Sequence, residues 1–288
     1  MTVLSIQSRV SFGHVGNCAA TLPLERLGQE VCPIDTVRFS SNPRYPGWRG
    51  TVVDETEMRG IVEGLDALPE EAGGGLGFVR AVLTGYFGSA GQVTVAADAV
   101  DRVRRRVPGA FYLFDPVIGD YPGGRYVQPG VAEAMVEHLL PRANLVVPNH
   151  FELDHLTGRH TRTRAEVIEA LDRLAAMGPE MAVATSVKVA ETAAGSVEVI
   201  AVGRAGRFRI ETPLVPVHFS GTGDMFSAVL LADWLTHRDL SRAIRRAVAA
   251  TWAVVEESRK LGGPELALVA AQEAMLAADY RAVGVHPL

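Results

Sequence analysis

The segment Ser220-Gly221-Thr222-Gly223-Asp224 combines a turn that could bind phosphate with a carboxylate that could act as a base. The apolar run 225–235 follows it directly and predicts a helix that begins at this turn. Glycines at a helix start leave backbone N–H groups accessible, and the helix dipole adds positive charge, so the turn suits a transferring phosphoryl group. The charge of Asp224 would repel a nucleotide, but its carboxylate could take the proton from an attacking hydroxyl. The alternative is an ordinary helix start, capped by Thr222 or Asp224.

Asp115 follows the apolar run 111–114 and precedes Pro116. In open α/β sheets, ligands bind beyond the carboxyl ends of the strands. A carboxylate at that edge can hold Mg²⁺, directly or through water, beside the oxygens of a triphosphate. The alternative is a structural Asp-Pro turn that ends the strand.

Two further polar segments also follow apolar runs. Asn149-His150-Phe151-Glu152 comes after the expected strand 144–148, so Glu152 could join Asp115 in a metal shell. Asn149 and Glu152 also have the spacing of a capping box, which is the structural alternative. Thr185 and Ser186 end another apolar run and place two hydroxyls where a nucleotide phosphate could lie.

Short apolar runs alternate with longer amphipathic ones, which predicts an α/β fold with a mostly parallel central sheet and helices on both faces. The expected strands are 3–7, 30–35, 79–84, 111–117, 144–148 and 181–186. The expected helices are 16–27, 55–68, 92–107, 130–140 and 164–177. Residues 197–203 and 207–212 bracket a turn at 204–206 and predict a β-hairpin. From residue 221 to about 278 the chain reads as helical, with breaks near 236–239 and 262–264.

The 288 residues contain no repeat or low-complexity linker, so we expect one domain over residues 1–288. The segment 38–49 is a loop long enough to cover a site. A net charge of −5 argues against nucleic acid and anionic membranes as partners. The basic run 102–106 then reads as a solvated helix face. The first residues lack the pattern of a signal peptide, and Cys18 and Cys32 read as ordinary buried thiols, so we expect a cytoplasmic protein.

From about residue 3 to about residue 280 the sequence resembles a pyridoxal kinase of the ribokinase-like superfamily. Segments 115–120, 149–152 and 221–224 are similar to superfamily elements. Segments 6–17, 36–40 and 84–89 are similar to motifs that separate kinases for B6 vitamers from sugar kinases, so they are the more specific.

The resemblance implies an enzyme that phosphorylates the 5′-hydroxymethyl group of pyridoxal, and of pyridoxine or pyridoxamine as further candidates, with ATP as co-substrate and Mg²⁺ as cofactor. A need for a monovalent cation such as K⁺ is left open, and a homodimer is implied. Ser8 would hydrogen-bond the pyridine ring, and Val15, Phe39 and Tyr86 would shape the pocket. The phosphate-side residues would be Asp115, Asn149 and Glu152 for Mg²⁺ and phosphates, Thr185 and Ser186 for the nucleotide, Gly221, Thr222 and Gly223 for the transferring phosphoryl group, and Asp224 as the base.

Positions 9 and 43 are among those that depart from the family pattern. Arg9 stands where a histidine is usual, and Pro43 replaces a threonine whose hydroxyl meets the substrate. Two alternatives therefore stay open. One is a kinase for hydroxymethylpyrimidine on the same fold, and the other is a protein that binds pyridoxal or its phosphate without catalysis. Asp224 argues against the second, because a storage protein needs no base.

Overall fold

Ten strands form one sheet in the computed structural model, which describes residues 1–204 and 206–288 of the chain. The strands at the centre of the sheet are parallel, which confirms the predicted mostly parallel sheet. Its strands, in spatial order, are β2 (Glu30–Phe39), β1 (Thr2–Val10), β4 (Val79–Thr84), β5 (Phe111–Phe114), β8 (Leu145–Val146) and β9 (Met181–Val187). The antiparallel edge strands are β3 (Gly50–Val52) beside β2, and β10 (Ser196–Gly203), β11 (Gly206–Pro213) and β12 (His286–Pro287) beyond β9.

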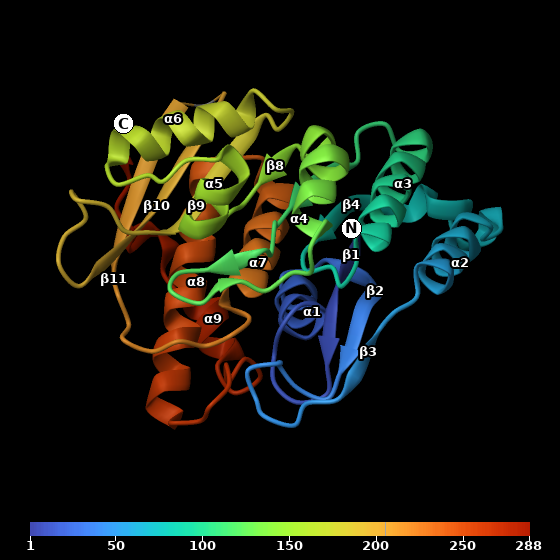
Figure 1. Ribbon diagram of the computed structural model, residues 1–288, viewed down its shortest axis with the longest axis horizontal. Coiled ribbons are helices and arrows are strands. Elements are labelled where there is room, and N and C mark those ends of the chain that lie inside the picture. Colours follow the sequence, from blue (N-terminus) through green and yellow to red (C-terminus); the bar gives the residue numbers. More distant parts are fainter. Residues whose placement is uncertain (205) are drawn as a thin grey trace.

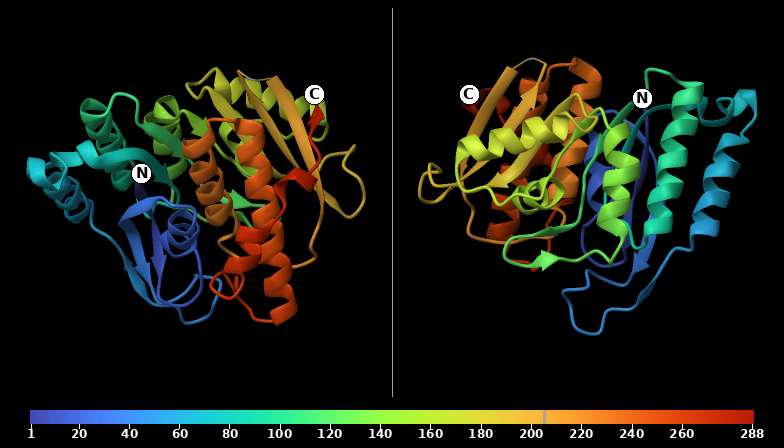
Figure 2. Two further views of the ribbon diagram at one scale, coloured as in Figure 1. Left: turned by 180° about the vertical axis from the view of Figure 1, so that it is seen from behind. Right: turned by 45° about the horizontal axis from the view of Figure 1, so that its top comes forward.

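Helices cover both faces of the sheet because its strand residues alternate between two apolar clusters. Tyr112 packs into the cluster on one face and Leu113 into the cluster on the other. The first face carries α2 (Glu55–Asp66), α3 (Ala90–Arg106), α4 (Val131–Ala134), α5 (His150–Thr157) and α6 (Arg164–Ala175) (Figure 1). The other carries α1 (Asn17–Arg26), α7 (Thr222–His237), α8 (Leu240–Leu261) and α9 (Gln272–Ala277) (Figure 2, left). Short helical turns are η1 (Glu70–Ala72), η2 (Gly75–Phe78), η3 (Met135–Leu139), η4 (Leu140–Arg142) and η5 (Tyr280–Ala282).

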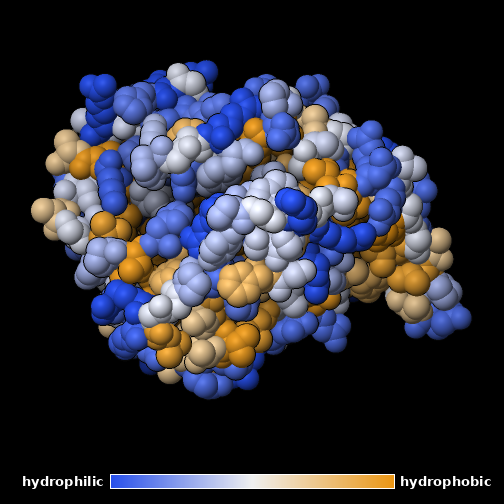
Figure 3. All heavy atoms as spheres, turned by 60° about the horizontal axis from the view of Figure 1, so that its bottom comes forward, coloured by the Kyte–Doolittle hydropathy of each residue, from blue (hydrophilic) through white to orange (hydrophobic). Residues whose placement is uncertain are grey.

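The parallel strands bring their carboxyl ends to one edge of the sheet, which is the lower edge in Figure 1. The loops after β1, β2, β4 and β5 lie at this edge, together with the hairpin of β6 (Gly119–Asp120) and β7 (Gly124–Arg125). Figure 3 looks toward this side and shows hydrophobic side chains scattered among hydrophilic ones. The predicted site residues therefore have a common edge on which to meet.

Several predicted boundaries were wrong. The strand predicted at 111–117 ends at Phe114, since Pro116 has no N–H for a ladder, and that predicted at 144–148 narrows to Leu145–Val146. The helix predicted at 130–140 changes from α-helical to π-helical at Met135. Strands β3, β6, β7 and β12 were not expected. The 197–212 hairpin is confirmed, although Ala205 in its turn lies outside the described residues.

The basic run on α3 is only partly a solvated face. Arg105 and Arg106 are exposed, but Arg104 is half-buried and donates to Asn144 Oδ1 at 2.7 Å. Cys18 and Cys32 are both free thiols. Within residues 1–204 and 206–288, we find no helix with the length and apolar character that crossing a bilayer requires.

Candidate active site

Asp224 lies in the first turn of α7 and faces the loop that follows β1. Its Oδ2 accepts a hydrogen bond from the backbone N–H of Gly16 at 2.8 Å. The turn before it needs glycine, because Gly221 has a φ of +89° and a Cβ there would lie 1.8 Å from the carbonyl oxygen of His14. Among the described residues no side chain caps this helix at Gly221. The geometry thus favours the base over the capping alternative for Asp224.

The environment of Asp224 suits proton transfer. Burial raises the pKa of its carboxyl group above the ordinary value, and the hydrogen bond from Gly16 opposes that rise. The residue is only half-buried by surface area, so a substrate hydroxyl can approach it. A carboxylate with a raised pKa is a better proton acceptor than one in water.

Asp115 begins the loop after β5 and is joined to α7. Its backbone N–H donates to the carbonyl of Thr84 at 3.0 Å, and its Oδ2 accepts from Ser227 Oγ at 2.7 Å. The side chain is almost fully buried. Burial, together with the negative charge of Asp224, raises the pKa of Asp115. Asp115 therefore does more than end a strand, since it brings a second carboxylate toward Asp224.

Glu152 forms the capping box that was the structural alternative for this segment. Its backbone N–H donates to Asn149 Oδ1 at 3.0 Å, and its Oε2 accepts from the backbone of Asn149 at 2.8 Å. Its Oε1 accepts from the backbone N–H of Ile118 at 2.9 Å and, more weakly, from Gly119 at 3.4 Å. Glu152 thus fixes the loop after β5 to the start of α5. Oε2 accepts only one of these hydrogen bonds and keeps a second lone pair, so this role leaves room for water or a cation.

At this edge the pKa values of Asp115 and Glu152 are each raised in part by a neighbouring carboxylate. Burial is the main cause for Glu152, and the charge of Asp115 adds to it, as that of Asp224 does for Asp115. A cation among them would offset this repulsion. In the part of the chain that the structure describes, no three His, Cys, Asp or Glu side chains are close enough to hold one ion alone. Mg²⁺ fits such a place, because it usually keeps waters and binds phosphate oxygens beside one or two carboxylates.

Thr185 and Ser186 lie near the end of β9, next to the capping box. The backbone N–H of Thr185 donates to the carbonyl of Pro148 at 2.9 Å, and Thr185 forms an isolated parallel bridge with Asn149. Ser186 is exposed and has a φ of +54°, which is unusual for a residue other than glycine. Both residues stand on the same sheet edge as Asp115 and Glu152.

The residues expected to hold a vitamer follow β1, β2 and β4. Ser8 is buried near the end of β1, and its Oγ lies 2.3 Å from the place a Cβ of Gly16 would take. Phe39 ends β2, and Tyr86 is half-buried in the loop after β4, where burial raises its pKa. Val15 is half-buried in the loop that leads to Gly16.

A buried amide joins the elements that carry these residues. Asn17 donates to the carbonyl of Ile34 at 3.1 Å and to Asp35 Oδ1 at 2.9 Å, and it accepts from Ser5 Oγ at 2.8 Å. Strands β1 and β2 are thereby tied to the start of α1. Thr36 Oγ1 adds a bond to the carbonyl of Tyr86 at 2.7 Å. These hydrogen bonds therefore join the elements on which the four expected pocket residues stand.

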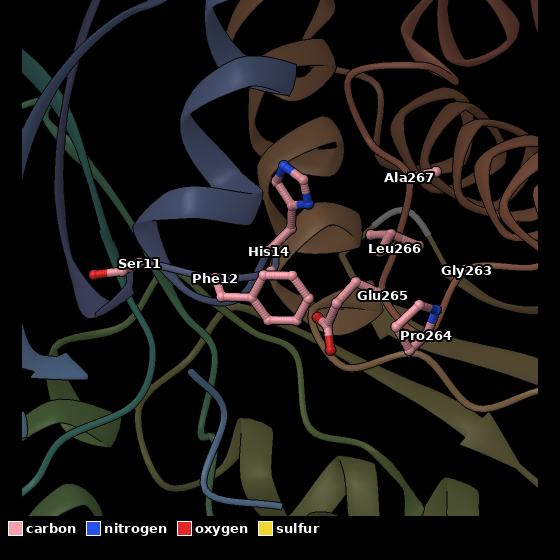
Figure 4. A pocket seen from close by; sticks show the side chains of 9 residues that line it. Ser11, Phe12, His14, Gly263, Pro264, Glu265, Leu266 and Ala267 are labelled. Atoms are coloured by element: carbon pink, nitrogen blue, oxygen red, sulfur yellow. The ribbon is translucent and has the colours of Figure 1, made fainter. Parts of the chain in front are cut away.

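Two features of this edge were missed in the sequence. The hairpin β6–β7 precedes Tyr126, whose pKa is raised by burial and by the carboxylates of Asp120, Glu152 and Asp224. Its signal was the glycine cluster Gly119, Gly123 and Gly124, but strands of two residues show no periodicity. The second feature is a cavity of about 440 Å³ lined by residues 11–14 and 263–267, with Glu265 beside the ring of Phe12 (Figure 4).

Comparisons with known proteins agree with this geometry. Residues 77–267 match the family described as phosphomethylpyrimidine kinase. The pyridoxal kinase PdxY of Leifsonia xyli is 37% identical over 273 residues, which cover 95% of each chain. That of Rubrobacter xylanophilus is 38% identical and covers 98% of this chain and 96% of its own.

A solved structure of pyridoxal kinase from Leishmania donovani, in complex with ADP and pyridoxine, superposes with a TM-score of 0.89. It is 30% identical, and the match covers 100% of this chain and 99% of that one. The fold is therefore ribokinase-like, as the sequence predicted. Full-length identity of this order, together with the shared fold, leads to one conclusion: the chain belongs to the pyridoxal kinase family.

Proposed function

We propose that this protein transfers the γ-phosphoryl group of ATP to the 5′-hydroxymethyl group of pyridoxal, which gives pyridoxal 5′-phosphate and ADP. The observation that carries the proposal is the position of Asp224. Its carboxylate stands beside the Gly221–Gly223 turn and is bonded to Gly16 of the expected vitamer side. One residue thus joins the phosphate side to the vitamer side.

In the proposed reaction Asp224 takes the proton of the 5′-hydroxyl. The freed oxygen bonds to the γ-phosphorus, the bond from that phosphorus to the β–γ bridging oxygen breaks, and ADP leaves. The backbone N–H groups of the turn at Gly221 and Gly223, with the dipole of α7, stabilise charge on the transferring group.

We propose Mg²⁺ as the cofactor, held near Asp115 and Glu152, with Asn149 next to it. When bound, it would neutralise charge on the phosphates. Thr185 and Ser186 would line the nucleotide site. A requirement for a monovalent cation such as K⁺ is a prediction that assays in KCl and NaCl at equal ionic strength would test.

The homodimer and the single domain are also part of the proposal. The ten-stranded sheet includes strands from residue 2 to residue 287, which supports one domain over 1–288. Light scattering at micromolar concentration tests the dimer.

The match to the phosphomethylpyrimidine kinase family favours hydroxymethylpyrimidine as a second candidate substrate. The segments that carry Ser8, Phe39 and Tyr86 favour pyridoxal, because they resemble motifs of kinases for B6 vitamers. With both compounds and limiting Mg-ATP in one vessel, kcat/KM for pyridoxal is expected to exceed that for the pyrimidine by about tenfold or more. Chromatography of the products measures this ratio, and preferential phosphorylation of the pyrimidine would assign the other substrate.

Pro43→Thr is expected to lower the KM for pyridoxal several-fold and to leave that for ATP unchanged. A hydroxyl there could add one hydrogen bond, which is worth roughly 0.5–1.5 kcal/mol. Pro43 is exposed and takes the second position of a turn that the Tyr45 N–H closes on the Asn42 carbonyl at 3.0 Å. Steady-state kinetics for both substrates would decide. A KM for pyridoxal that stays the same or rises would mean that the rigid turn counts for more than the hydroxyl.

A further inference from the structure

The loop of residues 40–49 reaches from β2 to β3 and is closed at its base. The Ser40 N–H donates to the carbonyl of Arg49 at 2.6 Å, and the Arg49 N–H donates to Ser40 Oγ at 2.9 Å. The ring of Trp48 packs on that of Phe39, with 4.6 Å between centroids. Movement of this loop would therefore change the packing of the Phe39 ring, a wall of the expected vitamer pocket, while the Phe39 backbone stays paired with β1 and β3.

The tip of the loop is shaped to present two side chains. Asn42 Oδ1 accepts from the Arg44 N–H at 2.9 Å, and the turn at Pro43 directs the chain back at Tyr45. Both side chains bond to one carboxylate oxygen, Glu265 Oε1. Arg44 Nη2 donates to it at 2.6 Å, and the Tyr45 hydroxyl donates a short hydrogen bond.

The residues that follow Glu265 fix its position in the fold. The neighbouring Ala267 N–H donates to Ser258 Oγ of α8 at 2.9 Å, and Leu266 is fully buried. The side chain of Glu265 is only 11% exposed. Arg44 Nη2 also donates to the carbonyl of Pro264 at 2.7 Å, so the loop is bound to the segment 263–267 at more than one point.

The carboxylate of Glu265 also lies against the loop that follows β1 and leads to Gly16, the residue whose N–H binds Asp224. A Cβ at Gly13 would lie 2.3 Å from Glu265 Oε2, and Gly13 has a φ of +91°, so glycine is required there. The Phe12 N–H donates to the carbonyl of Ser40 at 2.9 Å, and the ring of Phe12 meets that of Tyr45 edge-on at 5.9 Å. Figure 4 shows the ring of Phe12 beside the carboxylate of Glu265. Glu265 therefore contacts both segments that border the vitamer side.

We propose that Glu265 is a positioning residue for the vitamer: by binding Arg44 and Tyr45 it holds the 40–49 loop, and with it Phe39, closed over the ring. The inference rests on the proposed function. Glu265 would thus affect the affinity for pyridoxal but not the affinity for ATP. The reason is that the residues on the phosphate side lie on other elements, β5, α5 and α7.

Glu265→Ala is expected to raise both the KM and the dissociation constant for pyridoxal about tenfold, the order of one lost charge-assisted hydrogen bond, with the KM for ATP within about twofold. Glu265→Gln should restore pyridoxal affinity to within about threefold. Oε1 accepts both bonds and Oε2 has no partner among the described residues, so an amide oxygen can replace Oε1. Tyr45→Phe should weaken pyridoxal binding in the wild type and add little to Glu265→Ala.

Glu273→Ala is a control for the loss of an ion pair away from the site: Glu273 accepts from Arg26 at the same 2.6 Å, but it is exposed and joins α9 to α1. Equilibrium dialysis with pyridoxal alone and steady-state kinetics give the two readouts. Pyridoxal affinity unchanged in both Glu265→Ala and Tyr45→Phe, or an equal rise in the KM for ATP, would overturn the inference. If Glu265→Ala fails to fold, Tyr45→Phe tests the same contact. A wild-type protein that binds pyridoxal but does not turn it over would instead refute the proposed function.

Discussion

Asp224→Asn is expected to lower kcat by roughly 10²–10⁴-fold, the usual worth of a general base. The attacking hydroxyl must lose its proton near the transition state, and asparagine cannot accept it. Asparagine keeps the size of aspartate and an oxygen that can accept from the Gly16 N–H, so the fold should hold. Affinity for Mg-ATP should stay the same or rise, because a negative charge near the phosphates is gone. Fixed-time assays of product formation measure kcat, and nucleotide titration measures the affinity for Mg-ATP.

The matched control lies on the same helix. Asp233 is buried near the other end of α7 and accepts from Arg242 Nε at 3.1 Å. Asp233→Asn should lower the melting temperature and leave kcat within a few-fold of wild type. If Asp224→Asn behaves like this control, with kcat within about threefold of wild type, Asp224 has no part in the mechanism.

Glu152→Gln is expected to raise the Mg²⁺ concentration for half-maximal rate about 10–100-fold, the usual effect of changing a residue that orients a metal site. The amide carries less charge, and its NH₂ must face a backbone N–H of either Asn149 or Ile118. Thermal stability should fall less, since a cap is worth about 1 kcal/mol and glutamine keeps part of it. Mg²⁺ titration of the rate gives the first quantity and thermal unfolding the second.

A second capping box provides the control for Glu152. Thr163 and Glu166 cap α6 in the same way, and Glu166 Oε2 accepts from the Thr163 N–H at 2.9 Å. Glu166→Gln should lower thermal stability, because it weakens a cap, and should leave the Mg²⁺ requirement unchanged. Equal Mg²⁺ requirements in the two variants would mean that Glu152 is a cap alone.

The fold could be predicted because its signals are local. Buried parallel strands appear in the sequence as apolar runs. The glycines of the turn before α7 lie within one short segment and are visible there as well. Strand ends were predicted less well: β5 ends at Phe114, although the N–H of Asp115 still donates to Thr84 of β4. The helix predicted at 130–140 changes to π-helical geometry at Met135, a change that apolar periodicity does not show.

The site could be predicted only in part. Its carboxylates stand at the ends of apolar runs, which is a visible pattern. The capping box of Asn149 and Glu152 and a metal-shell role share one spacing, so the sequence left both open, and only the structure adds the bond to Ile118. Glu265 and its partners Arg44 and Tyr45 lie more than two hundred residues apart in the chain. No periodicity or motif joins them, because the contact is made by tertiary packing.

Phosphorylation of pyridoxal, with ATP as the phosphoryl donor, can be observed directly. Purified protein incubated with pyridoxal, ATP and Mg²⁺ is the direct test, with pyridoxal phosphate followed by its absorbance and ADP by chromatography. We expect both products to appear in a one-to-one ratio, and neither to appear with Asp224→Asn beyond the residual rate expected for that variant. Release of ADP without pyridoxal phosphate, or no turnover of pyridoxal by a folded protein that binds both substrates, would contradict it.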